Sequence, residues 1–282
     1  MAPGSAEEKI AAIYSTLLRA WGRQHWWPAQ TRFEVIVGAY LTQNTSWTNV
    51  EVALRRLRKA HVLSVDGIRK ISLKKLEQLI RSSGYFRQKA RKLKTFVRFL
   101  DQHYAGSLNK MFAQPTTKLR EELLALNGVG PETADSILLY AGQHPVFVVD
   151  AYTKRLAARH GILAETAKYE EFRSLFERAL GDMNSFDPPV VKTHSYTDIA
   201  DDTSPADSMK RVGAGVYARP GTFIGIASHQ PSRMSLAKRT PLAQVYNEMH
   251  GLIVSAGKQY CVKAKGRCEE CPLRHLLEPI TV

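Results

Sequence analysis

The stretch that most constrains this chain runs from Leu126 to Gly161, where a glycine-rich turn joins two helical runs and one aspartate precedes a third. Gly128 and Gly130 flank Val129 in the turn, and glycine permits a sharp bend that leaves backbone N–H groups pointing outward. Pro131 follows at a helix start, where its missing N–H costs nothing. Amides at such a helix start suit an anion such as a phosphate diester. The turn alone predicts either an anion site or a plain helix–turn–helix corner.

Asp150 ends a short apolar run, residues 146–149, and directly precedes a helical run that starts at Ala151. Aspartate is a favoured helix N-cap, so a purely structural role would account for it. The same position also suits chemistry, because a carboxylate at a helix N-terminus stays ionised and, in a cleft, can stabilise a developing cation. Both interpretations remain open at this point.

The pattern L-x-G-V-G-x-x-T-A, with V-D further along, resembles the helix-hairpin-helix DNA glycosylases of the endonuclease III superfamily. The resemblance covers about residues 8–180 and resumes over about 240–275. It implies that the hairpin amides of Gly128, Val129 and Gly130 hold the DNA backbone. It also implies that Asp150 is essential for breaking the glycosidic bond.

One position departs from the bifunctional members of this family, in which a lysine after the hairpin forms a Schiff base. This chain has Glu132 there. A carboxylate cannot form an imine, so the lyase step lacks its nucleophile unless Lys154, one helical turn after Asp150, replaces it. The run G-x-E-T-A-D-x-I-L-x-Y-A resembles the monofunctional 3-methyladenine DNA glycosylase branch. We therefore take Asp150 and Glu132 as the candidate catalytic residues and expect base removal alone.

Three tryptophans, Trp26, Trp27 and Trp47, are the candidate base pocket. Under the resemblance, their rings would stack on an electron-poor alkylated purine, much as aromatic rings hold a cation. Tryptophan is also common in protein cores because of its size. At least one of Trp26 and Trp27 is expected to face inward.

Further DNA contacts follow from the resemblance. Gln43 and Asn44 interrupt an apolar helical run, and the family has a polar side chain there that fills the hole left by an extruded base. The segment G-Y-F-R-Q-K-A resembles the family's wedge segment. Tyr85 would be the wedge, because intercalating side chains are usually apolar or aromatic, and Lys89 would contact DNA. Surface loop packing is the alternative for Tyr85.

Cys261, Cys268 and Cys271 lie close together near the C-terminus, and their odd number argues against full disulfide pairing. Their spacing matches the first three ligands of the family's 4Fe–4S loop, whose fourth cysteine would fall at Leu277. Either another group completes the cluster, the site is labile, or the loop is a metal-free relic. With His275, the three cysteines would alternatively form a zinc site.

The apolar periodicity predicts an all-α fold, and the resemblance implies two helical lobes with the active cleft between them. Amphipathic runs recur near residues 6–21, 31–41, 47–60, 73–82, 87–103, 117–126, 131–142, 151–160, 168–180 and 241–257. The expected terminal lobe comprises 1–30, 151–182 and 240–282 with the cysteine loop, and the central lobe 31–150 with the hairpin. Residues 183–239 look like an insertion, expected to be mobile because Pro, Gly, Ser and Asp interrupt every periodic run.

Composition agrees with a polyanionic partner, since 40 Lys and Arg against 26 Asp and Glu give a formal charge of +14. The expected protein is a monomeric DNA glycosylase of base excision repair that acts on duplex DNA containing a damaged base. A bifunctional glycosylase/lyase and a non-catalytic DNA-binding module remain as alternatives. Without a signal peptide or an apolar run long enough for a membrane span, we expect a reduced compartment, cytoplasmic (nucleoid-associated in a bacterium) or nuclear.

Overall fold

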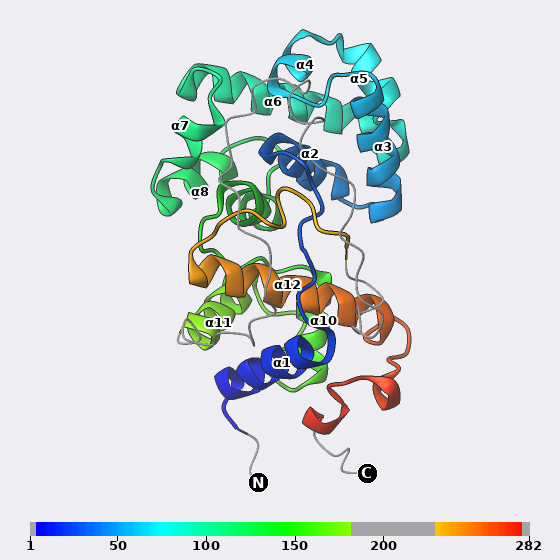
Figure 1. The fold of residues 1–282 in the computed structure, drawn as a ribbon, viewed down its shortest axis with the longest axis vertical. Coiled ribbons are helices and arrows are strands. Elements are labelled where there is room, and N and C mark those ends of the chain that lie inside the picture. Colours follow the sequence, from blue (N-terminus) through cyan, green and yellow to red (C-terminus); the bar gives the residue numbers. More distant parts are fainter. Residues whose placement is uncertain (1–3, 182–228, 278–282) are drawn as a thin grey trace. The chain divides into compact units, whose positions relative to one another are not determined.

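The computed structural model describes residues 4–181 and 229–277, and these residues form helices joined by loops (Figure 1). No β-strand occurs in the described ranges, which confirms the all-α prediction. Backbone contacts divide the chain into two compact units. Of the described residues, 4–28, 145–181 and 229–277 belong to the terminal unit, and 29–144 belong to the central unit.

The terminal unit is built around α12 (Pro241–Gln259), in which every residue from Val245 to Gly257 is buried. A helix buried on all sides must be covered all round. In this unit α12 contacts α1 (Ala6–Trp21), α10 (Ala151–Arg159) and α11 (Tyr169–Gly181). Two short helical turns, η5 (Cys268–Glu270) and η6 (Arg274–Leu276), follow it in the cysteine loop.

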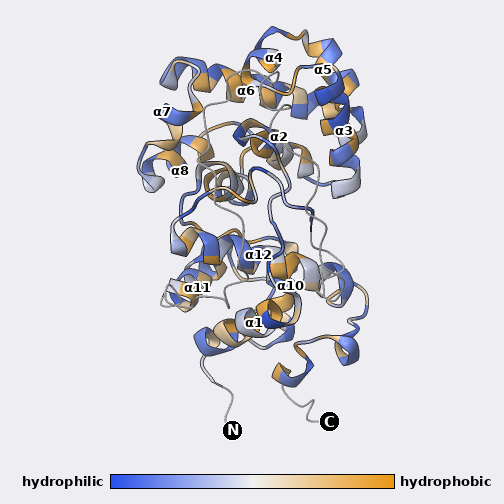
Figure 2. Cartoon of the chain, viewed as in Figure 1, coloured by the Kyte–Doolittle hydropathy of each residue, from blue (hydrophilic) through white to orange (hydrophobic). Residues whose placement is uncertain are grey.

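The central unit is built around α2 (Arg32–Thr42), whose residues Phe33 to Leu41 are all buried. Its other long helices are α3 (Trp47–Lys59) and α6 (Phe86–Tyr104). The remaining elements are α4 (Val65–Lys70), α5 (Leu73–Leu79), η1 (Arg81–Ser83), α7 (Leu108–Phe112), α8 (Thr116–Leu124), α9 (Pro131–Ser136) and η2 (Ile137–Gly142). Hydrophilic residues dominate α3 in Figure 2, and its last turn carries Arg56, Arg58 and Lys59.

A buried ion pair joins α8 to α9 in the central unit. Arg120 Nε and Nη2 donate to the two carboxylate oxygens of Asp135 at 2.6 and 3.0 Å, and the Asp135 side chain is fully buried. Two parallel hydrogen bonds fix the geometry as well as the charge. The short helix α9, which follows the glycine-rich turn, is thereby held against α8.

Each predicted helical run corresponds to a helix, but two short helices were not predicted. α4 and α7 have six and five residues, too few for apolar periodicity to show. Both are started by a serine, since Ser64 Oγ accepts from Gly67 N and Ser107 Oγ accepts from Lys110 N. The N-cap is therefore the only local signal for them.

The prediction of a mobile 183–239 insertion is wrong for its last part, residues 229–239. His229 N donates to Gln24 O at 3.2 Å, Ser232 Oγ donates to Trp27 O at 3.3 Å, and Met234 is fully buried. This segment therefore packs into the terminal unit. The rest of the predicted insertion, residues 183–228, lies outside the described residues. None of the helices in the described ranges combines the length and hydropathy needed to cross a bilayer.

Candidate functional site

Asp150 is positioned by an extended apolar segment that precedes it in the terminal unit. Val146 to Val149 are almost completely buried, so their backbone needs internal hydrogen-bond partners. Two side chains from α11 supply them: Phe147 N donates to Glu177 Oε1 at 3.0 Å, and Val149 N donates to the Tyr169 hydroxyl at 3.3 Å. The backbone is thus fixed up to the residue before Asp150.

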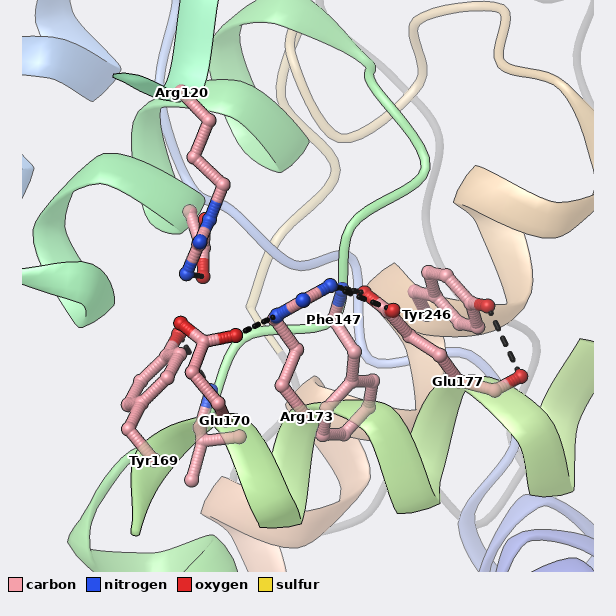
Figure 3. A network of polar contacts seen from close by, with 9 residues as sticks. Arg120, Phe147, Tyr169, Glu170, Arg173, Glu177 and Tyr246 are labelled. Atoms are coloured by element: carbon pink, nitrogen blue, oxygen red, sulfur yellow. Dashed lines mark hydrogen bonds and ion pairs between the residues drawn. The ribbon is translucent and has the colours of Figure 1, made fainter. Parts of the chain in front are cut away.

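Arg173 holds one of these side chains, Glu177, in place (Figure 3). Its guanidinium donates to Glu177 at 2.7 and 2.9 Å and to Glu170 at 2.7 Å. The Tyr246 hydroxyl of α12 donates to the backbone carbonyl of Glu177 at 3.2 Å. The network connects α11, α12 and the segment that leads to Asp150.

Asp150 is the N-cap of α10, so the structural interpretation of this residue is correct. Its Oδ1 accepts from Thr153 N at 2.8 Å and from Thr153 Oγ1 at 3.0 Å. The cap orients the carboxylate, and its other oxygen, Oδ2, lies 3.6 Å from His250 Nε2. The Asp150 side chain is 15% exposed, so the group is accessible but largely desolvated.

The pKa of Asp150 is lowered from its ordinary value. Burial acts to raise it, but the nearby imidazole of His250, when protonated, and the hydrogen bonds from Thr153 outweigh burial. The carboxylate therefore stays ionised at neutral and mildly acidic pH. Sequence reasoning missed His250, because a histidine in a helix far along the chain gives no sign of its partner.

Trp26 and Trp27 lie in the same unit, near His250. The two indole rings meet edge-on, with centroids 5.2 Å apart, and the Trp26 ring lies 6.0 Å from the His250 ring and 5.4 Å from that of His229. Both tryptophans are buried, at 7% and 5% exposure. The structure thus brings Asp150, His250 and the two candidate pocket tryptophans together.

Lys154, the conceivable substitute for a lyase lysine, is engaged elsewhere. Its Nζ donates to Ala167 O at 3.0 Å and lies 5.2 Å from the centre of the Phe172 ring. Glu132 and Trp47 belong to the central unit. Glu132 is exposed in the first turn of α9, and Trp47 Nε1 donates to Glu51 at 2.9 Å.

The glycine-rich turn in the central unit is tied to the end of α2. Gly128 has a φ of +78°, which favours glycine, and Gly130 is the N-cap of α9. Gln43, the C-cap of α2, donates to Gly128 O at 3.1 Å and to Thr133 Oγ1 at 2.9 Å. Two of the predicted DNA-contacting sites, the hairpin and Gln43, therefore form one surface, which also includes the neighbouring exposed Asn44.

Lys92 of α6 completes this surface. Its Nζ donates to Gln43 Oε1 at 2.7 Å, and a Cβ placed on Gly128 would meet its side chain at 2.2 Å. The backbone angle thus favours glycine here, whereas the flexible end of the Lys92 side chain can shift away from an added Cβ. A positive charge held beside the turn suits the anion site predicted from the turn.

Tyr85 and Lys89 lie at opposite extremes of exposure. Tyr85 is 66% exposed in a left-handed backbone conformation at the start of α6. Lys89 is 2% exposed, and its Nζ donates to Leu41 O at 2.9 Å and Ser83 O at 2.6 Å. The assignment of Lys89 to DNA contact is corrected by this burial: Lys89 joins α6 to α2 and η1 from inside.

The cysteine loop lies against the C-terminal end of α10. Arg155 Nε donates to Cys261 O at 2.5 Å, and Arg159 Nη1 donates to Cys261 Sγ at 3.2 Å. The sequence placed this loop far from Asp150, but α10 connects the two directly. All three cysteines are free thiols.

Comparisons with known proteins identify the family of this chain. The family profile of the HhH-GPD superfamily base excision DNA repair proteins matches residues 37–181. A candidate DNA repair glycosylase of Methanocaldococcus jannaschii, MJ1434, is 38% identical over 269 residues, which cover 95% of this chain and 94% of the relative. Endonuclease III of Thermotoga maritima is 31% identical over 129 residues, covering 46% of this chain and 56% of that enzyme.

Two solved structures share the fold over most of their length. The crystal structure of H. pylori 3-methyladenine DNA glycosylase (MagIII) bound to 1,N6-ethenoadenine has a TM-score of 0.64 and 27% identity, covering 91% of this chain and 98% of that one. A non-covalent endonuclease III–DNA complex has a TM-score of 0.64 at 19% identity, covering 96% and 95%. The latter similarity shows the shared fold.

The burial of Lys89 predicts how the free energy of unfolding depends on pH. Burial, with a smaller contribution from Lys92, lowers the pKa of Lys89 to about 8, below its ordinary value of 10.5. Between about pH 8 and pH 10.5 Lys89 is more often protonated in the unfolded chain than in the folded one. The contribution of Lys89 to the free energy of unfolding therefore increases as pH rises through this range. We expect urea unfolding at several pH values to show this rise relative to Lys89→Met.

The exposed neighbour Lys74 provides the control, because Lys74→Met should leave the pH dependence unchanged. If the free energy of unfolding depended on pH in the same way in the unmodified protein and in Lys89→Met, the interior position of the ammonium group would be contradicted.

Proposed function

Because the chain belongs to the HhH-GPD superfamily of base excision DNA repair proteins and is a DNA repair glycosylase, we propose that it is a monofunctional enzyme that removes alkylated purines. The observation that carries the monofunctional assignment is Glu132 at the position of the lyase lysine. The engagement of Lys154 by Ala167 and Phe172 supports it, since the one lysine considered as a substitute is then held away from imine formation.

In the proposed reaction Asp150 stabilises the cation that forms as the C1′–N bond breaks. The leaving base takes the bonding electron pair, and the sugar gains oxocarbenium character. A water oxygen then bonds to C1′ and its proton passes to solvent, which leaves an abasic sugar and the free, neutral base. Asp150 suits this role because its cap with Thr153 orients the carboxylate and His250 keeps it ionised.

The proposed substrate class follows from the aromatic cluster and from the relative. Alkylated purines carry or approach a positive charge, and such rings bind well against indole faces. Trp26 and Trp27 are buried, so they are proposed as a fixed wall of the pocket. The half-buried Trp47 of the central unit is proposed as a further aromatic residue for base recognition. The H. pylori relative is named as a 3-methyladenine DNA glycosylase bound to ethenoadenine. A base that already carries charge leaves readily and needs no strong general acid. Glu132 is kept as a proposed second catalytic carboxylate.

DNA engagement is proposed to use the central unit. The amides of Gly128, Val129 and Gly130 would hold a phosphate, with Lys92 adding charge beside the turn. Gln43 and Asn44 would fill the space left by the flipped nucleotide. Tyr85 is proposed as the wedge, because it is an exposed aromatic residue in a rigid turn at a helix start.

Substituting Asp150 tests the mechanism. Asp150→Asn should lower single-turnover excision from duplexes with 3-methyladenine or ethenoadenine by at least about a hundredfold, the scale of a lost electrostatic stabiliser. DNA affinity should stay close to that of the unmodified protein. The matched control is Asp66→Asn, an exposed carboxylate of α4. Undiminished excision by Asp150→Asn would remove this residue from the mechanism.

A panel of lesions tests the substrate class separately. Duplexes carrying alkylated purines should be processed faster than those carrying oxidised pyrimidines, uracil or mismatched adenine. Preference for an oxidised pyrimidine would refute the substrate proposal without touching the role of Asp150.

The position of His250 beside Asp150 predicts how the excision rate depends on pH. In His250→Gln the pKa of Asp150 should rise, because the charge of His250 is the largest contribution that lowers it. The acid limb of the excision rate should then move to higher pH by about one unit, the lower end of the effect of a nearby opposite charge. His229→Gln is the control, since His229 also contacts Trp26 but is not a source of the Asp150 shift. An unmoved acid limb in His250→Gln would contradict the role of this histidine.

Trapping with borohydride tests the absence of a lyase step. The unmodified protein should give no covalent DNA adduct and no strand cleavage beyond that caused by alkali, because an imine requires an amine. Glu132→Lys should give weak trapping, since it places an amine at the family's nucleophile position. A stable adduct with the unmodified protein would instead assign a bifunctional enzyme.

A further inference from the structure

The three cysteine side chains and His160 line one cavity at the C-terminal end of α10. Leu277 lines it too, at the position where the family's iron–sulfur loop would carry its fourth cysteine. A leucine side chain has no donor atom, and a 4Fe–4S cluster normally takes four protein ligands. The loop can therefore hold a complete cluster only if another side chain supplies the fourth.

His160 has the properties of that missing ligand. It is the C-cap of α10 and is 6% exposed. Its Nδ1 is buried without a hydrogen-bond partner among the described residues, which is uncommon for a polar atom in a folded protein. The same ring bonds to the backbone of Leu276, the residue next to Leu277. Imidazole nitrogen replaces thiolate as an iron ligand in Rieske centres, so the chemistry has a precedent.

Other side chains near the loop are less suitable. His275, considered from the sequence as a zinc ligand, is exposed. Glu269 is exposed and pairs with Arg274 at 2.7 Å. Arg159 lines the cavity, but a guanidinium has only N–H donors and cannot ligate a metal; its Nη1 donates to Cys261 Sγ at 3.2 Å.

The spacing of the donors favours a cluster over a single ion. No three His, Cys, Asp or Glu side chains in the described ranges are gathered closely enough to hold one metal ion. A zinc site needs its four donors around one centre. In a 4Fe–4S cluster each protein ligand binds a different iron, so the donors surround a larger body and need not be close together.

We propose that His160, through Nδ1, is the fourth ligand of a 4Fe–4S cluster whose other ligands are Cys261, Cys268 and Cys271. The cluster supplies no step of base excision. It fastens the cysteine loop to the end of α10, whose first turn holds Asp150. The exposed basic residues of the loop, Lys263, Lys265 and Arg267, are then held in place for a DNA phosphate.

Pulsed EPR on the full chain tests this assignment without any substitution. Protein reconstituted anaerobically with iron and sulfide should be yellow-brown and contain about four irons per chain. The reduced cluster should show nitrogen hyperfine coupling typical of a bound imidazole. A cluster without nitrogen coupling would overturn the proposal, as would protein that takes up no iron or only zinc.

Three variants separate ligation from folding. His160→Ala should lose the nitrogen coupling and about one iron per chain, whereas His275→Ala, the matched control, should keep both. His160→Cys should restore four irons without nitrogen coupling and should lower the reduction potential, because an anionic thiolate replaces a neutral imidazole. Coupling that survives in His160→Cys or disappears in His275→Ala would overturn the assignment, and circular dichroism verifies that each variant is folded.

Discussion

The arrangement of the candidate site depends on helix α10, because chemically reactive groups lie at both of its ends: the Asp150 carboxylate at its start and the cysteine loop at its end. Its start is capped by Asp150, whose carboxylate bonds to Thr153 and faces His250. Its other end carries Arg155 and Arg159, which bind the cysteine loop. From Asp150 to His160 the helix rises about 15 Å. A change in the cysteine loop therefore reaches the candidate catalytic carboxylate through one rigid element.

The burial of α12 explains how the other side of the Asp150 site, the side formed by α12, is held in place. Since α12 is covered all round, a polar residue on it must find an internal partner, and His250 finds Asp150. Gly251 and Gly257 allow close packing, because a Cβ at these positions would meet Trp26 at 3.0 Å and Tyr152 at 2.2 Å. The same helix thus fixes the aromatic wall and lets α10 approach.

Local patterns predicted the helices well where a run was long and amphipathic. Ser5 and Thr31 start two of these helices, since each hydroxyl accepts from the backbone N–H three residues further on. Lys89 was misassigned, because a lysine in a basic segment gives no local sign that it is buried against two carbonyls. Residues 229–239 were misjudged for a similar reason: their polar composition hides the packing of Met234 and Ser232.

By itself the sequence determined the all-helical class, the glycine-rich turn, the capped Asp150 and the replacement of the lyase lysine by Glu132. These depend on backbone angles, helix periodicity and side-chain chemistry, which act over a few residues. Only the tertiary structure decided which groups meet across long stretches of chain: His250 with Asp150, Gln43 and Lys92 with the turn, and His160 with the cysteines. Such meetings depend on how buried faces pack, and the residue types at either end do not encode a partner that lies a hundred positions away.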